Sequence, residues 1–303
     1  MMKELPVWPY RTYNRGRWGN DLGTLNLLGK DAVERALRSV QSYENLSIGN
    51  NLVAEGSSPG NIVYRHEMTS FGSYSFSAAE EQLQNAADRI TIDIHGMVNT
   101  HIDALSHVGH RGISFNDVPF TDFASEKGVS RFTVLNMASI VTRAWLVDVP
   151  RQRSIDALEP GSPVLPADLA FLEGKFAAGD ALIVRTGRHR VAAVSADDPR
   201  AKDNHGNWSG LHVDCMELIA KWDAALVGTD GPGDNFPSTT AECSVPIHVI
   251  SEGYLGMPLV HTLNLEQLAD KMASRAEKSF MLTIAPLRIE YGTGSPVNPT
   301  AII

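Results

Sequence analysis

A short stretch of the chain is rich in side chains that can bind a metal. Within it lie His95, His101, Asp103, His107 and His110, although the 303 residues include only ten histidines. If residues 101–103 form a strand, His101 and Asp103 project from the same face and can hold one cation together. Mixed imidazole and carboxylate donors suit Zn²⁺, Mn²⁺ or Fe²⁺. The spacing therefore predicts a divalent metal site, with a structural hydrogen-bonded pair as the alternative.

Other histidines can join this site. His107 follows Asp103 by four residues, so it projects near the same point if the chain turns helical there. Metal sites also collect ligands from distant segments, which makes three further histidines candidates: His212, His248 and His261. Each of these alone is more often structural than a ligand. His110, which precedes Arg111 and Gly112, is more typical of a solvent-facing loop.

The segments around these histidines alternate between helix and strand. Regular apolar spacing predicts helices over residues 29–40, 165–176, 213–222 and 263–276. Short apolar runs predict strands over residues 46–52, 62–68, 89–94, 144–149, 181–184, 224–228 and 280–284. Residues 75–87 are small, polar and acidic, and we expect a helix or a mobile loop there. Helices that alternate with apolar strands predict an α/β fold whose strands are covered on both faces.

The two ends of the chain differ from this pattern. The first twenty residues lack helical or strand periodicity, and we expect residues 1–25 to form an N-terminal arm. We expect its aromatic residues Trp8, Tyr10 and Trp18 to pack against the body of the protein and not to cover a pocket. Residues 292–299 are rich in turn formers. Because no Pro/Ser linker or repeat interrupts the chain, we predict a single domain over residues 1–303.

The composition excludes several classes of partner. With 26 Lys and Arg against 35 Asp and Glu, the net charge is −9, which is unfavourable for nucleic acid or an anionic membrane. The densest basic stretch, residues 185–190, reads as a polar loop, in which Arg188 can contact an anionic substrate. No apolar run could span a bilayer, and no targeting segment is visible. Cys215 and Cys243 are too few for a disulfide framework, so we expect a reduced, cytoplasmic protein.

Several segments resemble the putative cyclase superfamily, which includes bacterial kynurenine formamidases and isatin hydrolase. The stretch Met97-Val98-Asn99-Thr100-His101-Ile102-Asp103-Ala104-Leu105-Ser106-His107 is similar to the family marker His-x-Gly-Thr-His-x-Asp-x-Pro-x-His. Similar stretches cover residues 17–28, 179–187, 245–248 and 285–299, and they indicate the longer members. The resemblance implies a swivelling β/β/α fold with mixed sheets flanked by helices, an oligomer, and metal-dependent amide hydrolysis.

The resemblance also implies roles for individual residues. His101 and Asp103 match two metal ligands, and His107 matches the acid–base histidine. His248 matches a later metal or active-site histidine. His261 falls where the short formamidases have a glutamate ligand, which leaves the number of metal ions open.

One family ligand is missing. The first ligand histidine of the marker falls at Met97, whose thioether is a poor ligand for a hard divalent ion. The nearest residues that could replace it are His95 and Asn99. We therefore expect the metal to be held by His95, His101, Asp103, His248 and His261.

We expect a hydrolase of a small amide, cyclic amide or imide, or lactone, with Zn²⁺ or Mn²⁺ as cofactor and a homo-oligomer, a dimer or tetramer, as its assembly. The metal would polarise the substrate carbonyl and lower the pKa of a bound water toward about 7, while His107 moves the proton. Arg188, His212 and Asp230 are the expected substrate contacts.

Three alternatives remain open. A nucleophilic serine or cysteine is disfavoured because no Gly-x-Ser-x-Gly elbow is present. A metal-free binding protein on the same fold would explain Met97. A metal-dependent lyase or cyclase would keep the metal and change the reaction.

Overall fold

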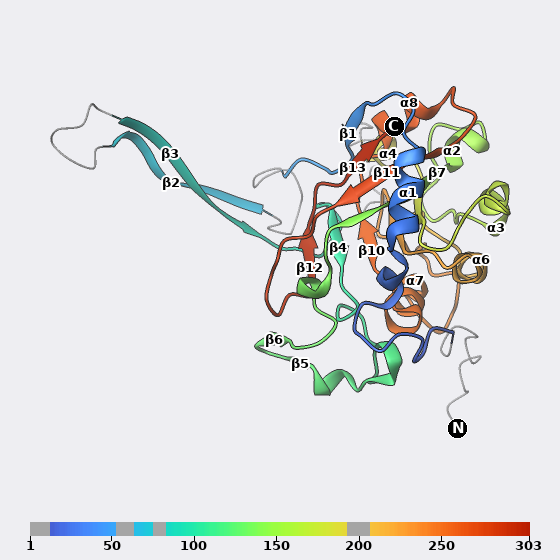
Figure 1. Cartoon of the computed structure of the whole chain (residues 1–303), viewed down its shortest axis with the longest axis horizontal. Coiled ribbons are helices and arrows are strands. Elements are labelled where there is room, and N and C mark those ends of the chain that lie inside the picture. The colour runs from blue at the N-terminus through green and yellow to red at the C-terminus, as the bar shows by residue number, and fades with distance from the viewer. Residues whose placement is uncertain (1–12, 53–63, 75–82, 193–206) are drawn as a thin grey trace.

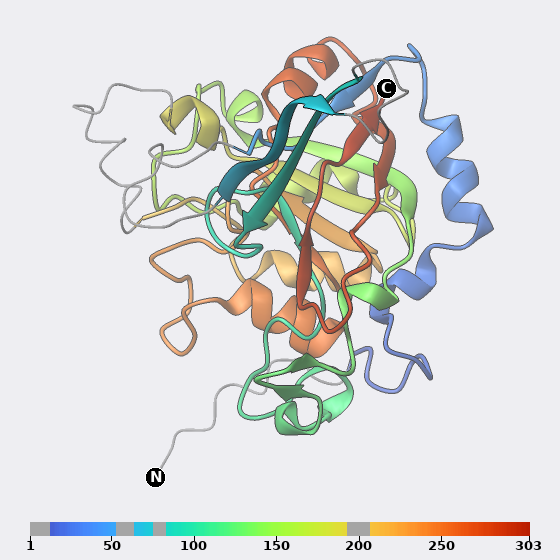
Figure 2. The same ribbon diagram turned by 90° about the vertical axis from the view of Figure 1, so that its left-hand side faces the viewer.

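A nine-stranded mixed sheet forms the body of the protein (Figures 1 and 2). The structure is a computed structural model that describes residues 13–52, 64–74, 83–192 and 207–303. In sheet order the strands are β1 Asn45–Ser47, β13 Thr300–Ile302, β11 Ser279–Ile284, β7 Ile140–Asp148, β8 Ala181–Arg185, β9 Leu226–Thr229, β10 Leu259–His261, β4 His101–Asp103 and β12 Gly294–Pro296. Strands β7, β8, β9 and β10 are parallel to one another, and the strands outside them pair antiparallel.

Both faces of the sheet are covered, as the apolar strand sequences predict. On one face, side chains such as Val147 and Val184 pack against helix α6, and on the other Leu146 and Ile183 pack against helix α8. The main described helices are α1 Lys30–Arg38, α2 Val149–Gln152, α3 Pro166–Leu169, α4 Arg188–Ala192, α6 Cys215–Lys221, α7 Pro246–His248 and α8 Glu266–Met272. The expected α/β architecture with helices flanking a mixed sheet is confirmed.

Shorter elements connect these layers. The 3₁₀ turns are η2 Gly23–Leu27, η3 Phe115–Asp117, η4 Phe120–Asp122, η5 Val134–Asn136 and η6 Ala170–Leu172, and a π-helix, η8, spans Val249–Leu255. A two-stranded sheet joins β5 Ala124–Ser125 to β6 Gly128–Val129. Within the described residues, no helix combines the length and apolar character needed to cross a membrane.

A long hairpin projects away from the body (Figure 1). Strand β2, Tyr64–Tyr74, pairs antiparallel with β3, Leu83–Ile92, which leads directly toward His95. Residues 83–87, expected to form a helix or mobile loop, belong to β3 instead, because they pair with β2. The expectations for residues 62–63 and 75–82 lie outside the described residues.

Three further expectations need correction or comment. The helix expected over residues 165–176 is broken into α3 and η6, and Gly174, at φ +74°, lies in the left-handed region that ends it. The turn-rich tail also contributes the edge strand β12. Trp18 packs against the cluster around Phe115 and Phe132, as expected, whereas Trp8 and Tyr10 lie outside the described residues.

Candidate metal centre

Three potential ligands meet at one edge of the sheet. Strand β10 ends at His261, and the antiparallel strand β4 begins at His101, which is its direct cross-strand partner. Directly opposed residues project from the same face, and Asp103 is two residues further along β4. The carboxyl ends of β9 and β10 lie at this edge, where ligands bind in open α/β sheets. The same-face arrangement predicted for His101 and Asp103 is therefore present.

Asp103 is at the centre of the cluster and is fully buried. Its Oδ1 lies 2.7 Å from Nδ1 of His95 and 3.5 Å from Nε2 of His101. Its Oδ2 lies 2.8 Å from Nε2 of His261 and 3.8 Å from Nε2 of His248. Burial raises the pKa of this carboxyl, but His261 and His95 outweigh that effect and hold the pKa well below its usual range. Asp103 is thus an anion among imidazoles.

Hydrogen bonds orient two of these imidazoles toward Asp103. Nδ1 of His101 lies 2.7 Å from the carbonyl oxygen of Asn99, so it carries the proton and leaves the Nε2 lone pair free. Nδ1 of His248 likewise bonds Oδ2 of Asp234. This carboxylate–histidine pairing is how metal-binding histidines are commonly fixed.

The environment shifts the pKa values of the two rings in opposite directions. Burial lowers the pKa of His101 to about 4, so the ring is neutral at pH 7. Burial also lowers the pKa of His248, but the hydrogen bond and charge of Asp234 outweigh it and raise the pKa. The two rings therefore differ in their affinity for a second proton, which is lower for His101 and higher for His248.

The central atoms are left without hydrogen bonds. Although Oδ2 of Asp103 and Nε2 of His261 are 2.8 Å apart, neither forms a hydrogen bond with any described residue. Buried polar atoms are nearly always paired, and an ion is one recognised reason for an exception. Ligand atoms of His101, Asp103 and His261 lie within 4.8 Å of one another. These residues fit a divalent cation with nitrogen and oxygen donors.

His95 supports Asp103 through both of its ring nitrogens. Since ionised Asp103 can only accept, Nδ1 of His95 donates to it, and Nε2, 2.8 Å from Oγ1 of Thr293, accepts the hydroxyl proton. A Cβ at Gly294 would come within 2.7 Å of Cε1 of His95, so only glycine leaves room for this ring. The other suggested replacement ligand, Asn99, directs its amide nitrogen to the carbonyl oxygen of Asp93.

His107 lies on the accessible side of the cluster. The chain after Asp103 forms a turn, closed by the backbone bond from His107 to Ala104, instead of the helix considered from spacing. The ring of His107 stacks on that of His95, with centroids 3.7 Å apart and planes 6° apart. Burial lowers its pKa to about 4, against the opposing effect of Asp103. The imidazole is thus neutral at pH 7 and can accept a proton.

The three expected substrate contacts differ in position. Asp230 is buried and accepts the backbone N–H groups of Thr186, Gly187 and Arg188, so it holds this loop and does not face a substrate. Arg188 reaches the Met97 carbonyl, 3.4 Å away, next to the cluster. His212 contacts Asp214 at 3.3 Å, and none of its described contacts joins it to the metal candidates.

Two carboxylates at the site were missed by sequence reasoning. Asp234 orients His248 and also accepts the backbone N–H of Ile247 at 2.6 Å. Glu252 is fully buried in the π-helix η8, and burial, with the negative charge of Asp103, raises its pKa well above its usual range. Sequence offers one signal for Glu252, its i, i+4 spacing from His248. No spacing pattern identifies Asp234.

A nucleophilic cysteine finds no support in the geometry. Cys215 is buried on α6, where burial raises the pKa of its thiol to about 12. The thiolate is the reactive form, so this side chain is inert at neutral pH. Both cysteines are free thiols.

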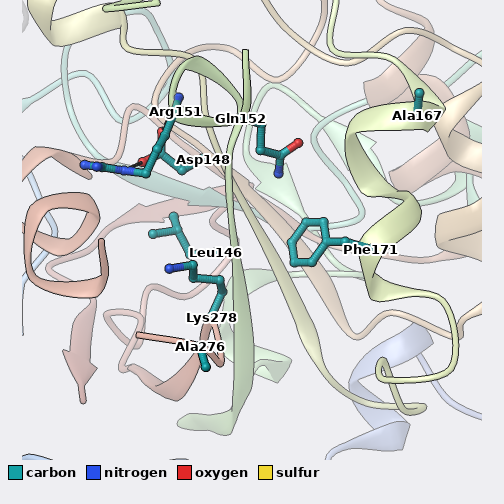
Figure 3. A pocket seen from close by; sticks show the side chains of 8 residues that line it. All are labelled: Leu146, Asp148, Arg151, Gln152, Ala167, Phe171, Ala276 and Lys278. Carbon is teal, nitrogen blue, oxygen red and sulfur yellow. Dashed lines mark hydrogen bonds and ion pairs between the residues drawn. The ribbon is translucent and has the colours of Figure 1, made fainter. Parts of the chain in front are cut away.

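A separate pocket of about 430 Å³ lies beside β7, away from the histidines (Figure 3). Its lining comprises Leu146, Asp148, Arg151, Gln152, Ala167, Phe171, Ala276 and Lys278. Strands β8, β9 and β10 separate β7 from β4. Arg151 pairs with Asp148 at 3.0 Å, and Lys278 donates to carbonyls at the end of α8. These polar groups are already satisfied, so we assign the pocket no chemistry.

The sequence and the fold of this chain are similar to those of known proteins. Residues 4–234 match the sequence model of a family described as Putative cyclase, whereas no curated protein matches the chain. A crystal structure of a novel cyclase is 26% identical, with a TM-score of 0.81, and the match covers 96% of this chain and 99% of that one.

Two isatin hydrolases show the same fold at lower identity. Isatin hydrolase A from Ralstonia solanacearum is 20% identical, with a TM-score of 0.55, over 85% of this chain and 91% of that one. An isatin hydrolase bound to the product analogue thioisatinate is 16% identical, with a TM-score of 0.54, and the match covers 86% of this chain and 92% of that one.

Proposed function

This chain belongs to the putative cyclase family, and we propose that it is a metal-dependent hydrolase of small amides, cyclic amides or imides, or lactones. The observation that carries the proposal is the buried Asp103 carboxylate, which lies among His101, His248 and His261. Neither Oδ2 of Asp103 nor Nε2 of His261 has a hydrogen bond with a residue in the described part of the chain. The names of the isatin hydrolases support a cyclic amide as substrate, since isatin contains one.

In this proposal His101, Asp103, His248 and His261 hold Zn²⁺ or Mn²⁺. When bound, such an ion polarises a carbonyl and lowers the pKa of a bound water. The Asn99 carbonyl and Asp234 keep the imidazoles in the tautomers that direct Nε2 toward Asp103. His95 fixes the other carboxylate oxygen, and we assign it a positioning role, not that of a ligand.

His107 is the proposed proton carrier. Its ring is neutral at pH 7, stands against His95 and adjoins Asp103, so it can take a proton from the attacking water and give it to the leaving nitrogen or oxygen. Arg188, beside the Met97 carbonyl, is the proposed contact for a substrate oxygen. We keep neither His212 nor Asp230 as a substrate contact.

The test is an acid-release assay on formyl amides, cyclic imides and lactones. We expect turnover of at least one class, loss after chelation, and recovery with Zn²⁺ or Mn²⁺. In Asp103→Asn, metal should not restore turnover, whereas Asp31→Asn, at an exposed position in the first turn of α1, should behave as the wild type. A protein that binds substrates with no metal requirement would support the metal-free binding protein. Products without added water would support the lyase or cyclase.

We further propose a homo-oligomer that buries the hairpin. On β3 the residues Ala86, Asp88 and Ile90 share one face, and their partners on β2 are Phe71, Met68 and His66. Phe71 is 88% exposed, Ile90 51% and Met68 49%. A two-stranded hairpin alone is marginally stable in water. The same face carries the His66–Asp88 pair, at 2.9 Å. A second copy of the chain is the proposed cover for the exposed Phe71, Met68 and Ile90.

A further inference from the structure

Glu252 is a buried carboxylate for which the chain itself supplies too few partners. It lies on the π-helix η8, which directly follows His248, and its side chain is fully buried. Oε2 accepts the backbone N–H of Val108 at 2.9 Å, whereas Oε1 has no hydrogen bond with any residue that the structure describes. Such a group is costly to bury unless another partner is present.

Glu252 lies close to two other candidate metal ligands. One ligand atom from each of Glu252, Asp103 and His248 lies within 4.8 Å of the others. Oδ2 of Asp103, which faces Nε2 of His248 at 3.8 Å, is likewise without a hydrogen bond among the described residues. Two carboxylates this close repel each other unless a proton or a cation lies between them.

The local helix geometry explains how Glu252 arrives there. His248 ends α7 and Glu252 follows four residues later, so both project from one side of the helix. The π-helix is a rare form that is frequently found at functional sites. The same contact from Glu252 to Val108 also fixes the chain next to His107.

We propose that Glu252 is a metal ligand, which binds the cation on the Oδ2 side of Asp103 together with His248. This inference rests on the proposed function, since it concerns the same cation. Glu252 adds a second carboxylate to the metal ligands. It also supplies a ligand in place of His95 and Asn99, since both ring nitrogens of His95 and the amide nitrogen of Asn99 are hydrogen-bonded.

The test is isothermal titration of the metal-stripped full chain with Mn²⁺. Glu252→Gln keeps the shape and removes the charge, and we expect its affinity to fall at least about 10-fold. Ser251→Ala is the matched control, because Ser251 is the buried neighbour on the same π-helix and its Oγ also lacks a described hydrogen bond. Its affinity should stay within about 2-fold of the wild type.

The outcomes separate this inference from the proposed function. If the wild type binds no Mn²⁺ or Zn²⁺, the proposed function fails and the inference fails with it. If the wild type binds and Glu252→Gln binds equally well, only the role of Glu252 is overturned. Should Glu252→Gln not fold, a crystal structure of the Zn²⁺-loaded wild type decides. A Glu252 oxygen within about 2.2 Å of the ion supports the inference, and one beyond about 3.5 Å overturns it.

Discussion

Oδ2 of Asp103 lies 2.8 Å from Nε2 of His261, yet across the described part of the chain neither atom takes part in a hydrogen bond. A carboxylate and an imidazole at this distance normally share a proton. The short separation places a carboxylate oxygen and an imidazole nitrogen where both can bind one cation. This relationship is the geometric basis for a shared cation.

The Asp234–His248 pair should control metal affinity. In Asp234→Asn the carboxylate that accepts the hydrogen bond from Nδ1 of His248 is lost. The ring is then oriented less firmly, and its Nε2 becomes a weaker metal ligand. We expect Zn²⁺ or Mn²⁺ affinity to fall about 10- to 100-fold, measured by titration of the metal-stripped protein. Because Asp234 also accepts the N–H of Ile247, thermal unfolding without metal serves as the control for folding. Unchanged affinity in a folded variant would remove Asp234 from the site.

Replacement of His107 should affect turnover and not metal content. Gln at this position cannot carry the proton, so kcat should fall about 10²- to 10⁴-fold while the bound metal per chain stays as in the wild type. Steady-state kinetics and metal analysis of the same preparation give both numbers. If His107→Gln lost its metal, His107 would be a ligand, and its assignment as proton carrier would be wrong.

In the metal-free protein, His101 and His107 should each destabilise the fold as the pH falls, whereas the raised pKa values of His248 and Glu252 act in the opposite direction. The pKa values of His101 and His107 are about 4 in the folded chain and near 6.5 in an unfolded one. Between these values unfolding adds protons to these two rings, so their contribution to the free energy of unfolding decreases from pH 7 toward pH 4. Each histidine should contribute about 1–3 kcal/mol to this decrease.

Denaturant titrations of chelated protein at pH 7.5 and 5 test this expectation. The decrease should be smaller in His107→Gln than in the wild type, because one of the two burial-shifted groups is gone. An equal decrease in both proteins would show that His107 is not held neutral by burial.

The hairpin should govern assembly. A charge at Phe71, on the apolar face, should dissociate the oligomer, whereas a charge at Thr91, which pairs with Arg65 on the opposite face, should not. Light scattering of Phe71→Glu and Thr91→Glu at several concentrations distinguishes the two. A monomeric wild type, or a Phe71→Glu protein that stays oligomeric, would contradict the proposed interface.

Local patterns predicted the parts of the site that depend on short-range geometry. The two-residue spacing of His101 and Asp103 places both on one face of β4, and the position of His248 beside Asp103 is the distant contact expected from the family resemblance. The α/β architecture followed from apolar strand sequences, which report burial on both faces.

The features that were missed depend on contacts or helix geometry that the local sequence pattern does not report. Residues 83–87 form a strand only because β2 pairs with them. Broad helix periodicity cannot locate the π-helix that contains Glu252, since its repeat differs from 3.6 residues. The hydrogen bonds of His95 to Asp103 and Thr293 also required the three-dimensional fold. The single domain over residues 1–303 stays a prediction.

The central claim is that Asp103 and its histidines bind a divalent metal. Anomalous diffraction at the Zn or Mn edge, from crystals of protein purified without chelator or reloaded with either ion, tests it most directly. The account predicts one strong peak bonded to Asp103 and to Nε2 of His261, at about 2.0–2.2 Å for Zn²⁺. A well-ordered cluster with no peak among Asp103, His101, His248 and His261, in protein supplied with both ions, would contradict it.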